Sequence, residues 1–141
     1  IYRDLKLENI MLDGEGNIKI TDFGLSRLGI TDNKDKAYSF AGTPEYLAPE
    51  IVKGTGHCKQ ADWWSLGSIL FEMITGKSPF YHKSIEKTLE NIVFKDIVIP
   101  PTVSKKAKNL IRGLLERDPS KRLGAKHDAI EIMDHPFFKD V

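Results

Sequence analysis

The chain has 141 residues, of which 40% are hydrophobic and 29% charged, and its formal net charge is +1. This composition is typical of one soluble globular domain or a piece of one, and the balanced charge argues against a nucleic-acid or membrane-surface partner. The single cysteine, Cys58, excludes a disulfide framework and favours a reducing compartment. We therefore expect a cytoplasmic location, with the nucleus as a further compartment. No apolar run reaches the roughly 20 residues that a membrane span needs.

The first predicted element is a small β-hairpin. The apolar runs Ile10–Leu12 and Ile18–Ile20 flank the turn-forming sequence DGEGN at 13–17. Residues 22–50 are rich in Gly, Thr, Ser, Asp, Lys and Pro, which predicts one long loop. Long loops in compact domains are usually either functional or disordered.

Four helices are predicted after this loop. Asp62 is predicted to cap a helix that ends at Gly76, while Ser84 and Ser104 are predicted to cap the next two. A short helix is expected over 129–133. The first of these helices is apolar almost all round, which indicates a buried central helix. The methionine and aromatic side chains of the helices are accordingly predicted to lie in the core.

Polar residues precede and follow the hairpin, whose geometry returns its two ends to one place. Asp4, Lys6 and Asn9 precede it and Asp22 follows it, so these side chains are expected to converge. A carboxylate and an amide oxygen suit Mg²⁺, with phosphate completing the coordination shell. Asp4 then remains to accept a proton or orient a hydroxyl, and Lys6 can meet developing phosphoryl charge. Taken singly, each residue is also an ordinary loop cap or solvated charge.

Several motifs, taken together, resemble the signature of eukaryotic protein kinases. They are RDLKLEN at 3–9, DFG at 22–24, APE at 48–50, DWWSLG at 62–67, RLG at 122–124 and HPFF at 135–138. The resemblance therefore covers the whole chain. Tyr2 before the first motif and GTPEYLAPE at 42–50 are similar to the AGC group of serine/threonine kinases. KAYSFAGTPEY at 36–46 resembles RSK-type kinases and, less closely, protein kinase B.

The resemblance implies an α+β, protein-kinase-like fold, with a mostly helical C-terminal lobe and a small β-hairpin near the catalytic loop. Residues 1–141 are expected to form a partial catalytic domain, with the catalytic loop at 2–9, the activation segment at 22–50 and the helical lobe at 60–138. Neither a G-x-G-x-x-G loop nor a V-A-I-K strand occurs in the sequence. We therefore expect the N-terminal lobe to be absent and the chain by itself to be inactive.

The implied activity is transfer of the γ-phosphate of ATP to Ser or Thr of protein substrates, with ATP and Mg²⁺ as cofactors. By resemblance, Asp4 is the catalytic base and Lys6 contacts the γ-phosphate. Asn9 and Asp22 hold Mg²⁺, and Asp22 also lies at the nucleotide phosphates. Phe23, followed by Gly24, packs to set active or inactive states.

Ser39 matches the activation-loop phosphosite of the family, which an upstream kinase would phosphorylate. Arg3 and Arg27 are placed to receive the phosphate and so to order the loop. The group commonly has Thr at this position and Cys in place of Ala41.

Two structural contacts are implied as well. Glu50 should pair with Arg122, which would tie the activation segment to the late helices. Asp62 should accept backbone N–H groups of the catalytic loop, in addition to capping its helix.

Substrate preference follows from the same resemblance. Glu8 and Glu90 match positions that meet arginines upstream of the target residue, so substrates with Arg at −3 and −2 are expected. Lys6 together with Thr43 is the serine/threonine choice. The pocket for the residue after the target would be lined by Phe40, Pro44 and Leu47.

Two other interpretations compete with an active kinase. A non-catalytic, kinase-like scaffold would usually have lost one of the catalytic residues, and Asp4, Lys6, Asn9 and Asp22 are all retained. An unrelated helical binding module would have to explain three motifs at family-like spacing as coincidence.

Overall fold

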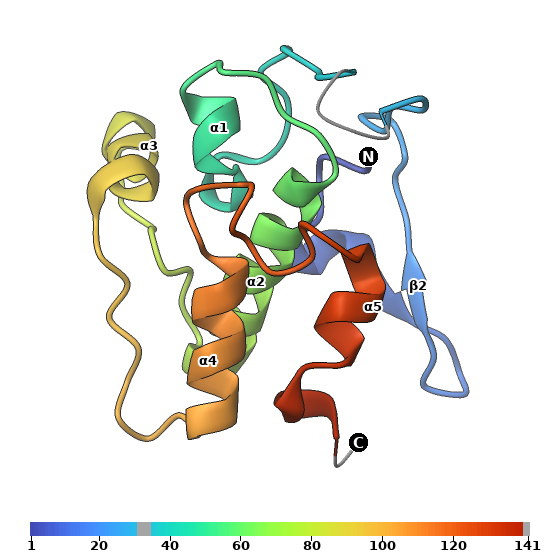
Figure 1. Ribbon diagram of the computed structural model, residues 1–141, viewed down its shortest axis with the longest axis vertical. Coiled ribbons are helices and arrows are strands. Elements are labelled where there is room, and N and C mark those ends of the chain that lie inside the picture. The colour runs from blue at the N-terminus through green and yellow to red at the C-terminus, as the bar shows by residue number, and fades with distance from the viewer. Residues whose placement is uncertain (31–34, 140–141) are drawn as a thin grey trace.

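The computed structural model describes residues 1–30 and 35–139 of the chain (Figure 1). In this range the chain forms one two-stranded sheet and five α-helices, so it is an α-rich fold with a small β-hairpin. The elements are β1 (Ile10–Leu12), β2 (Ile18–Ile20), α1 (Pro49–Val52), α2 (Gln60–Thr75), α3 (Ile85–Phe94), α4 (Lys105–Leu114) and α5 (Asp128–Met133). Helices α2 and α4 run through the middle, with α3 on one side and the hairpin on the other (Figure 1).

The predicted hairpin is present with the predicted bounds. β1 and β2 are antiparallel, with Ile10 opposite Ile20 and Leu12 opposite Ile18. Asp13 closes the turn, because its carboxylate accepts hydrogen bonds from the backbone N–H of Glu15 at 3.0 Å and from that of Asn17 at 2.8 Å. The hairpin is therefore fixed by its own turn, and its two ends stay together at the catalytic loop.

Helix α2 is the centre of the molecule. Trp64 is fully buried and stacks on Phe80 with 5.4 Å between ring centroids. Gly67 allows α4 to approach closely, since a Cβ there would lie 2.8 Å from Cβ of Leu114. The helix ends, as predicted, at Gly76, whose φ of +75° is the left-handed conformation that glycine adopts at helix ends.

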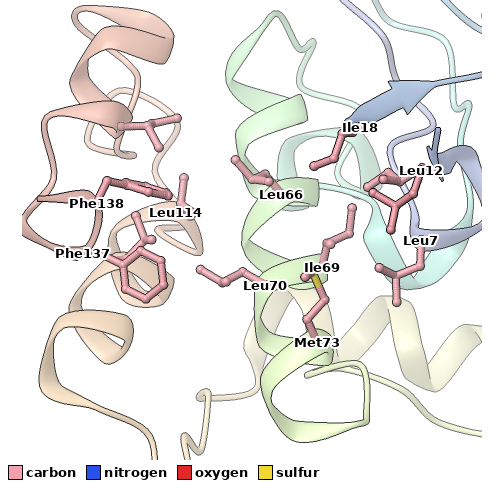
Figure 2. Close-up of a pocket in the computed structure, with 13 residues that line it drawn as sticks. Leu7, Leu12, Ile18, Leu66, Ile69, Leu70, Met73, Leu114, Phe137 and Phe138 are labelled. Atoms are coloured by element: carbon pink, nitrogen blue, oxygen red, sulfur yellow. The ribbon is translucent and has the colours of Figure 1, made fainter. Parts of the chain in front are cut away.

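Two expectations for α2 are wrong. The helix begins at Gln60, so Asp62 lies inside the first turn and makes no cap; its carboxylate is used by the catalytic loop instead. Met73 is 67% exposed rather than in the core, and Phe94 and Met133 are exposed as well. Met73 lines an open, apolar groove of about 450 Å³, shared with hairpin residues such as Leu12 (Figure 2).

The caps predicted for the next two helices are confirmed. The Ser84 hydroxyl accepts the N–H of Lys87 at the start of α3, and the Ser104 hydroxyl accepts the N–H of Ala107 at the start of α4. Each cap satisfies one of the N–H groups that a helix start leaves without a partner.

The segment 22–50 is more structured than one long loop. It contains a 3₁₀ helix at Pro44–Tyr46 and the beginning of α1. Its earlier part is held by backbone pairing between Ala37 and His57, with both N–H···O distances at 2.9 Å. Pro44 and Pro49 stand at the first position of these two short helices, where proline favours a helix start. The overall composition of the segment did not reveal these two helices. Within the described residues no helix combines the length and apolarity that crossing a bilayer requires.

Two buried histidines predict how stability depends on pH. Burial lowers the pKa of both His57 and His135 below the ordinary value of 6.5. The native state therefore favours the neutral rings, so their contribution is complete above about pH 6.5 and is lost as the pH falls below it. We expect the urea concentration at the unfolding midpoint to decrease when the pH is lowered from 7.5 to 5.5. The double variant His57→Gln/His135→Gln should show a weaker dependence of the midpoint on pH, whereas the exposed His127→Gln should not. The same dependence on pH in the unsubstituted protein and in both variants would contradict the role of the two buried histidines.

Candidate active site

Asp4 is the centre of a compact polar site. Its Oδ1 accepts hydrogen bonds from Thr43 Oγ1 at 2.8 Å and Thr43 N at 3.2 Å. Its Oδ2 lies 3.0 Å from Lys6 Nζ and 3.2 Å from Asn9 Nδ2. Lys6 also donates to Thr43 Oγ1 at 3.0 Å. The structure thus brings together Asp4, Lys6 and Asn9, as the sequence predicts, and adds Thr43 from the activation segment.

The contacts of Asp4 set its charge. Burial alone would raise the pKa of Asp4, but the hydrogen bonds from Thr43 and Lys6 outweigh it and the pKa is lowered. The hydrogen bond to Asp4 in turn raises the pKa of Lys6. At neutral pH the site therefore holds a carboxylate beside an ammonium group.

The backbone around Asp4 is held from two sides. The carboxylate of Asp62 accepts the N–H of Tyr2 and the N–H of Arg3, each at 2.8 Å, as the resemblance implied. Arg3 has a φ of +75°, which is unfavourable for a residue with a Cβ. On the other side Gly42 packs so tightly that a Cβ there would lie 2.6 Å from Arg3 O. This strained, doubly held backbone fixes the direction of the Asp4 side chain.

Asp22 lies next to the site but does not touch it. Thr21 N donates to Asn9 O at 3.0 Å, which holds the start of the DFG motif against the catalytic loop. Asp22 has a φ of +59°, its Oδ1 accepts the N–H of Gly24 at 3.2 Å, and its negative charge acts on Lys6. Gly24 suits this turn, since a Cβ there would lie 3.1 Å from Asp22 Oδ1.

The oxygens of Asn9 and Asp22 suit a hard cation. The amide nitrogen of Asn9 is used by Asp4, so its carbonyl oxygen remains as an acceptor. The second carboxylate oxygen of Asp22 accepts no hydrogen bond from any described residue. In the described part of the chain, no three His, Cys, Asp or Glu side chains are placed so that they could together hold a metal ion. These donors fit Mg²⁺ with phosphate oxygens and water as the remaining ligands.

Phe23 is not packed as expected. Its ring meets Tyr2 edge-on with 5.4 Å between centroids, yet the side chain is 64% exposed. Within the described residues it lacks the apolar surroundings that would hold it in one position.

Ser39 meets one of its two predicted cations. Arg3 Nη1 donates to Ser39 Oγ at 2.5 Å, and Arg3 Nε donates to Leu25 O at 2.6 Å, which positions the guanidinium. Arg27 forms no side-chain bond to Ser39, although its charge reaches His57 beside the same segment. The phosphate-receiving role of Arg27 stays a prediction.

An acidic group, formed by Glu8, Glu45 and Glu72, lies beside the catalytic loop. Burial raises the pKa of Glu45, and the negative charges of Glu72 and Glu8 raise it further. Glu72 on α2 accepts a hydrogen bond from Tyr46 Oη at 2.7 Å. Sequence reasoning missed Glu45 and Glu72, although the apolar run of α2 is interrupted by Glu72, which was a usable signal.

Glu90 is not part of this group. It is exposed on α3 and forms a surface ion pair with Lys87 at 2.8 Å. Of the predicted apolar pocket, Phe40 is exposed, whereas Leu47 is 2% exposed and belongs to the core. Leu47 therefore anchors the activation segment to the hydrophobic core. Of the three predicted pocket residues, Phe40 and Pro44 remain available to contact a substrate.

The predicted pair between Glu50 and Arg122 is present and fully buried. Arg122 Nη1 lies 2.7 Å from Glu50 Oε1, and Nη2 lies 2.9 Å from Oε2. Arg122 also donates to Gln60 O at 2.7 Å and stands over the ring of Trp64 at 5.3 Å. This bidentate pair links α1 to α2 and to the loop after α4.

Comparison with known proteins gives the same picture. A family model described as "Protein kinase domain" matches residues 1–138. The RAC-beta serine/threonine-protein kinase of Homo sapiens is 48% identical over 142 residues, which covers 100% of this chain and 29% of that protein. The serine/threonine-protein kinase YPK2/YKR2 of Saccharomyces cerevisiae is 50% identical over 141 residues, with 100% and 20% covered.

The chain thus spans about a fifth to a third of the length of these relatives. Their names confirm the resemblance to AGC-group serine/threonine kinases, while the nearer likeness to the RSK type stays a prediction. Catalytic loop, DFG motif and Glu50–Arg122 pair all occur within the matched residues, and the chain belongs to the protein kinase domain family.

Proposed function

We propose that the natural protein that carries this chain is a serine/threonine protein kinase. The observation that supports this best is the arrangement of Asp4, Lys6, Asn9 and Thr43, in a chain of the protein kinase domain family. A carboxylate kept ionised beside a cation and a hydroxyl can orient an alcohol for attack on phosphorus.

The chain's own residues would act as follows. Asp4 accepts the hydrogen bond of the substrate hydroxyl, and that proton ends on Asp4 as the oxygen–phosphorus bond forms and the bond to the departing diphosphate breaks. Lys6 stabilises the negative charge of the transferred group. Asn9 and Asp22 would hold Mg²⁺. When bound, ATP would supply the phosphoryl group and the metal would offset part of its negative charge.

The acceptor is proposed to be Ser or Thr. Lys6 and Thr43, which resemble the pair found in serine/threonine kinases, are hydrogen-bonded to each other and both contact Asp4, and this supports the proposal. The test uses the natural protein with Mg-ATP and two peptides that differ only in Ser or Tyr at the target position. Transfer to the serine peptide alone supports the proposal, and equal or preferred transfer to tyrosine contradicts it.

We propose further that substrates carry arginine upstream of the target residue. The acidic group supports this: Glu45, whose pKa is raised by burial and by the negative charges of Glu72 and Glu8, lies with these two carboxylates next to the catalytic loop. Glu72→Gln and Glu8→Gln should each lower kcat/KM for an Arg-containing peptide about tenfold, the equivalent of one charge-assisted contact. An Arg-free peptide should lose little.

Glu90→Gln is the matched control, because Glu90 is a carboxylate of the same type but lies outside the acidic group. If Glu90→Gln reduced the arginine preference and Glu72→Gln did not, the assignment of the acidic group would be wrong.

Ser39 is proposed to be phosphorylated by an upstream kinase, and its bond to Arg3 supports this. A phosphate would add about two negative charges there and pair with the guanidinium. Phosphorylation should raise kcat, and Arg3→Gln should remove most of that gain, roughly tenfold. Activity of phosphorylated and unphosphorylated protein is compared by steady-state kinetics, with exposed Arg112→Gln as the control. An undiminished gain in Arg3→Gln would contradict the pairing.

Two further proposals concern the activity of residues 1–141 by themselves and the cellular location of the protein. Residues 1–141 by themselves are proposed to transfer little phosphate, because no G-x-G-x-x-G loop or V-A-I-K lysine occurs among them. Cytoplasm, with the nucleus as a further compartment, is proposed as the location, and fractionation of cells followed by immunoblotting tests it.

A further inference from the structure

A polar cavity that none of the active-site residues lines lies where the activation segment meets the helical part of the chain. It has a volume of about 390 Å³. Lys36 comes from the activation segment, Lys53 from the end of α1, and Arg117 from the connection between α4 and α5, which passes close to α1 (Figure 1). Three cations from separate parts of the sequence therefore border one cavity.

The donors of these cations are largely unused. Among residues 1–30 and 35–139, the ammonium groups of Lys36 and Lys53 have neither a hydrogen bond nor an ion pair. Arg117 donates from Nε to Ile92 O at 3.0 Å and from Nη2 to Lys95 O, while Nη1 has no partner in the described range. Its backbone contacts hold the guanidinium in place and leave one edge for a ligand.

The acidic side chains at the cavity do not offset this charge. Both oxygens of Glu50 are bound by Arg122. Asp118 accepts two hydrogen bonds from Ser120 and lies 3.6 Å from Lys121. Since each carboxylate has a cation of its own, Lys36, Lys53 and Arg117 leave a surplus of positive charge.

Local packing places the stem of Lys36 beside Gly56, which also lines the cavity. Gly56 has a φ of +83°, and a Cβ there would lie 2.9 Å from Cδ of Lys36 and 2.8 Å from the ring of Tyr38. The methylene groups of Lys36 therefore pack directly on Gly56, where a residue with a Cβ would collide with them.

We propose that this cavity binds a phosphorylated side chain of a peptide, with Lys36, Lys53 and Arg117 contacting the phosphate. A phosphate dianion matches the surplus charge, and three separate cations can share its oxygens. The volume, more than ten times the roughly 30 Å³ of a water molecule, suits a phosphorylated residue better than a free ion. Occupancy would link Lys36, three residues before Ser39, to α1 and so steady the activation segment.

The test is a binding measurement on the natural protein, without ATP. The probes are a short alanine-rich peptide with one phosphoserine, the same peptide unphosphorylated, and inorganic phosphate. We expect the phosphopeptide to bind more tightly than the unphosphorylated one. Lys36→Gln and Lys53→Gln should each raise its Kd about tenfold, since each removes one charge-assisted contact.

Two variants separate this cavity from other positive surfaces. Lys83→Gln removes an exposed charge between α2 and α3, and Arg112→Gln removes an exposed charge on α4; neither residue lines the cavity. Both should leave the Kd of the phosphopeptide unchanged. Equal binding of the two peptides, or Kd values unaffected by Lys36→Gln and Lys53→Gln, would overturn the site.

Binding of inorganic phosphate without binding of the phosphopeptide would overturn the assignment to a peptide. Because no step needs phosphate transfer, a failure here is distinguishable from a failure of the proposed kinase activity.

Discussion

Asp4→Asn is expected to lower kcat of the natural protein by about a thousandfold or more, with little change in KM for the peptide. The substitution keeps the size of the side chain but removes its charge. Thr43 and Lys6, which both bond to the Asp4 carboxylate, would lose their shared anion. An amide can still accept a hydrogen bond from the substrate hydroxyl, yet it cannot take the proton.

The measurement is steady-state phosphate transfer to a serine peptide, together with a thermal unfolding curve that shows the variant is folded. Asp96→Asn is the matched control, because Asp96 is an exposed carboxylate on the connection after α3. A kcat for Asp4→Asn within threefold of the unsubstituted protein would remove Asp4 from its proposed role.

Glu50→Ala is expected to reduce the free energy of unfolding by roughly 3–5 kcal/mol. Arg122 is 1% exposed, so losing Glu50 would leave its guanidinium charge buried without a carboxylate. Its remaining bonds to the backbone oxygens of Glu116 and Gln60 satisfy donors but do not neutralise the charge. The cost is that of a buried, uncompensated charge rather than of a contact alone.

Urea unfolding followed by circular dichroism measures this loss. Glu90→Ala breaks the exposed pair with Lys87 and should cost less than about 1 kcal/mol. Removing both members of the buried pair, with Glu50→Ala and Arg122→Met together, should cost less than Glu50→Ala plus Arg122→Met measured singly. Additive losses would show that the two side chains do not stabilise each other.

The parts of the fold that depend on short stretches of sequence could be predicted. The hairpin follows from two apolar runs and one turn, and Ser84 and Ser104 cap helices because a serine hydroxyl meets an N–H three residues later. Convergence of Asp4 with Asn9 was predictable for the same reason, since they lie five positions apart in the chain and a hairpin follows.

Features that depend on distant residues could not be predicted from local patterns. Asp62 looks like a helix cap in isolation, but the N–H groups of Tyr2 and Arg3, about sixty residues away, take its oxygens. Met73 reads as core because its neighbours in sequence are apolar, yet its face of α2 borders an open groove (Figure 2).

The acidic group shows how resemblance and structure differ in reach. Glu90 matches a position that meets an upstream arginine in the family, and this role stays a prediction; in the structure Glu90 forms a surface pair with Lys87. Glu72 lies near Glu8 and Glu45 because α2 packs against the segment that carries Tyr46, whose hydroxyl donates a hydrogen bond to Glu72. The spacing of these residues in the sequence does not reveal this contact.

The most direct test of kinase function is to measure ATP binding and phosphate transfer in one sample of the natural protein. Mg-ATP affinity is taken from equilibrium titration, and transfer from labelled γ-phosphate recovered on a serine peptide. We predict saturable binding together with transfer that requires both Mg²⁺ and the Asp4 carboxylate. Binding of Mg-ATP with no label on the peptide would contradict a catalytic role and favour a kinase-like scaffold.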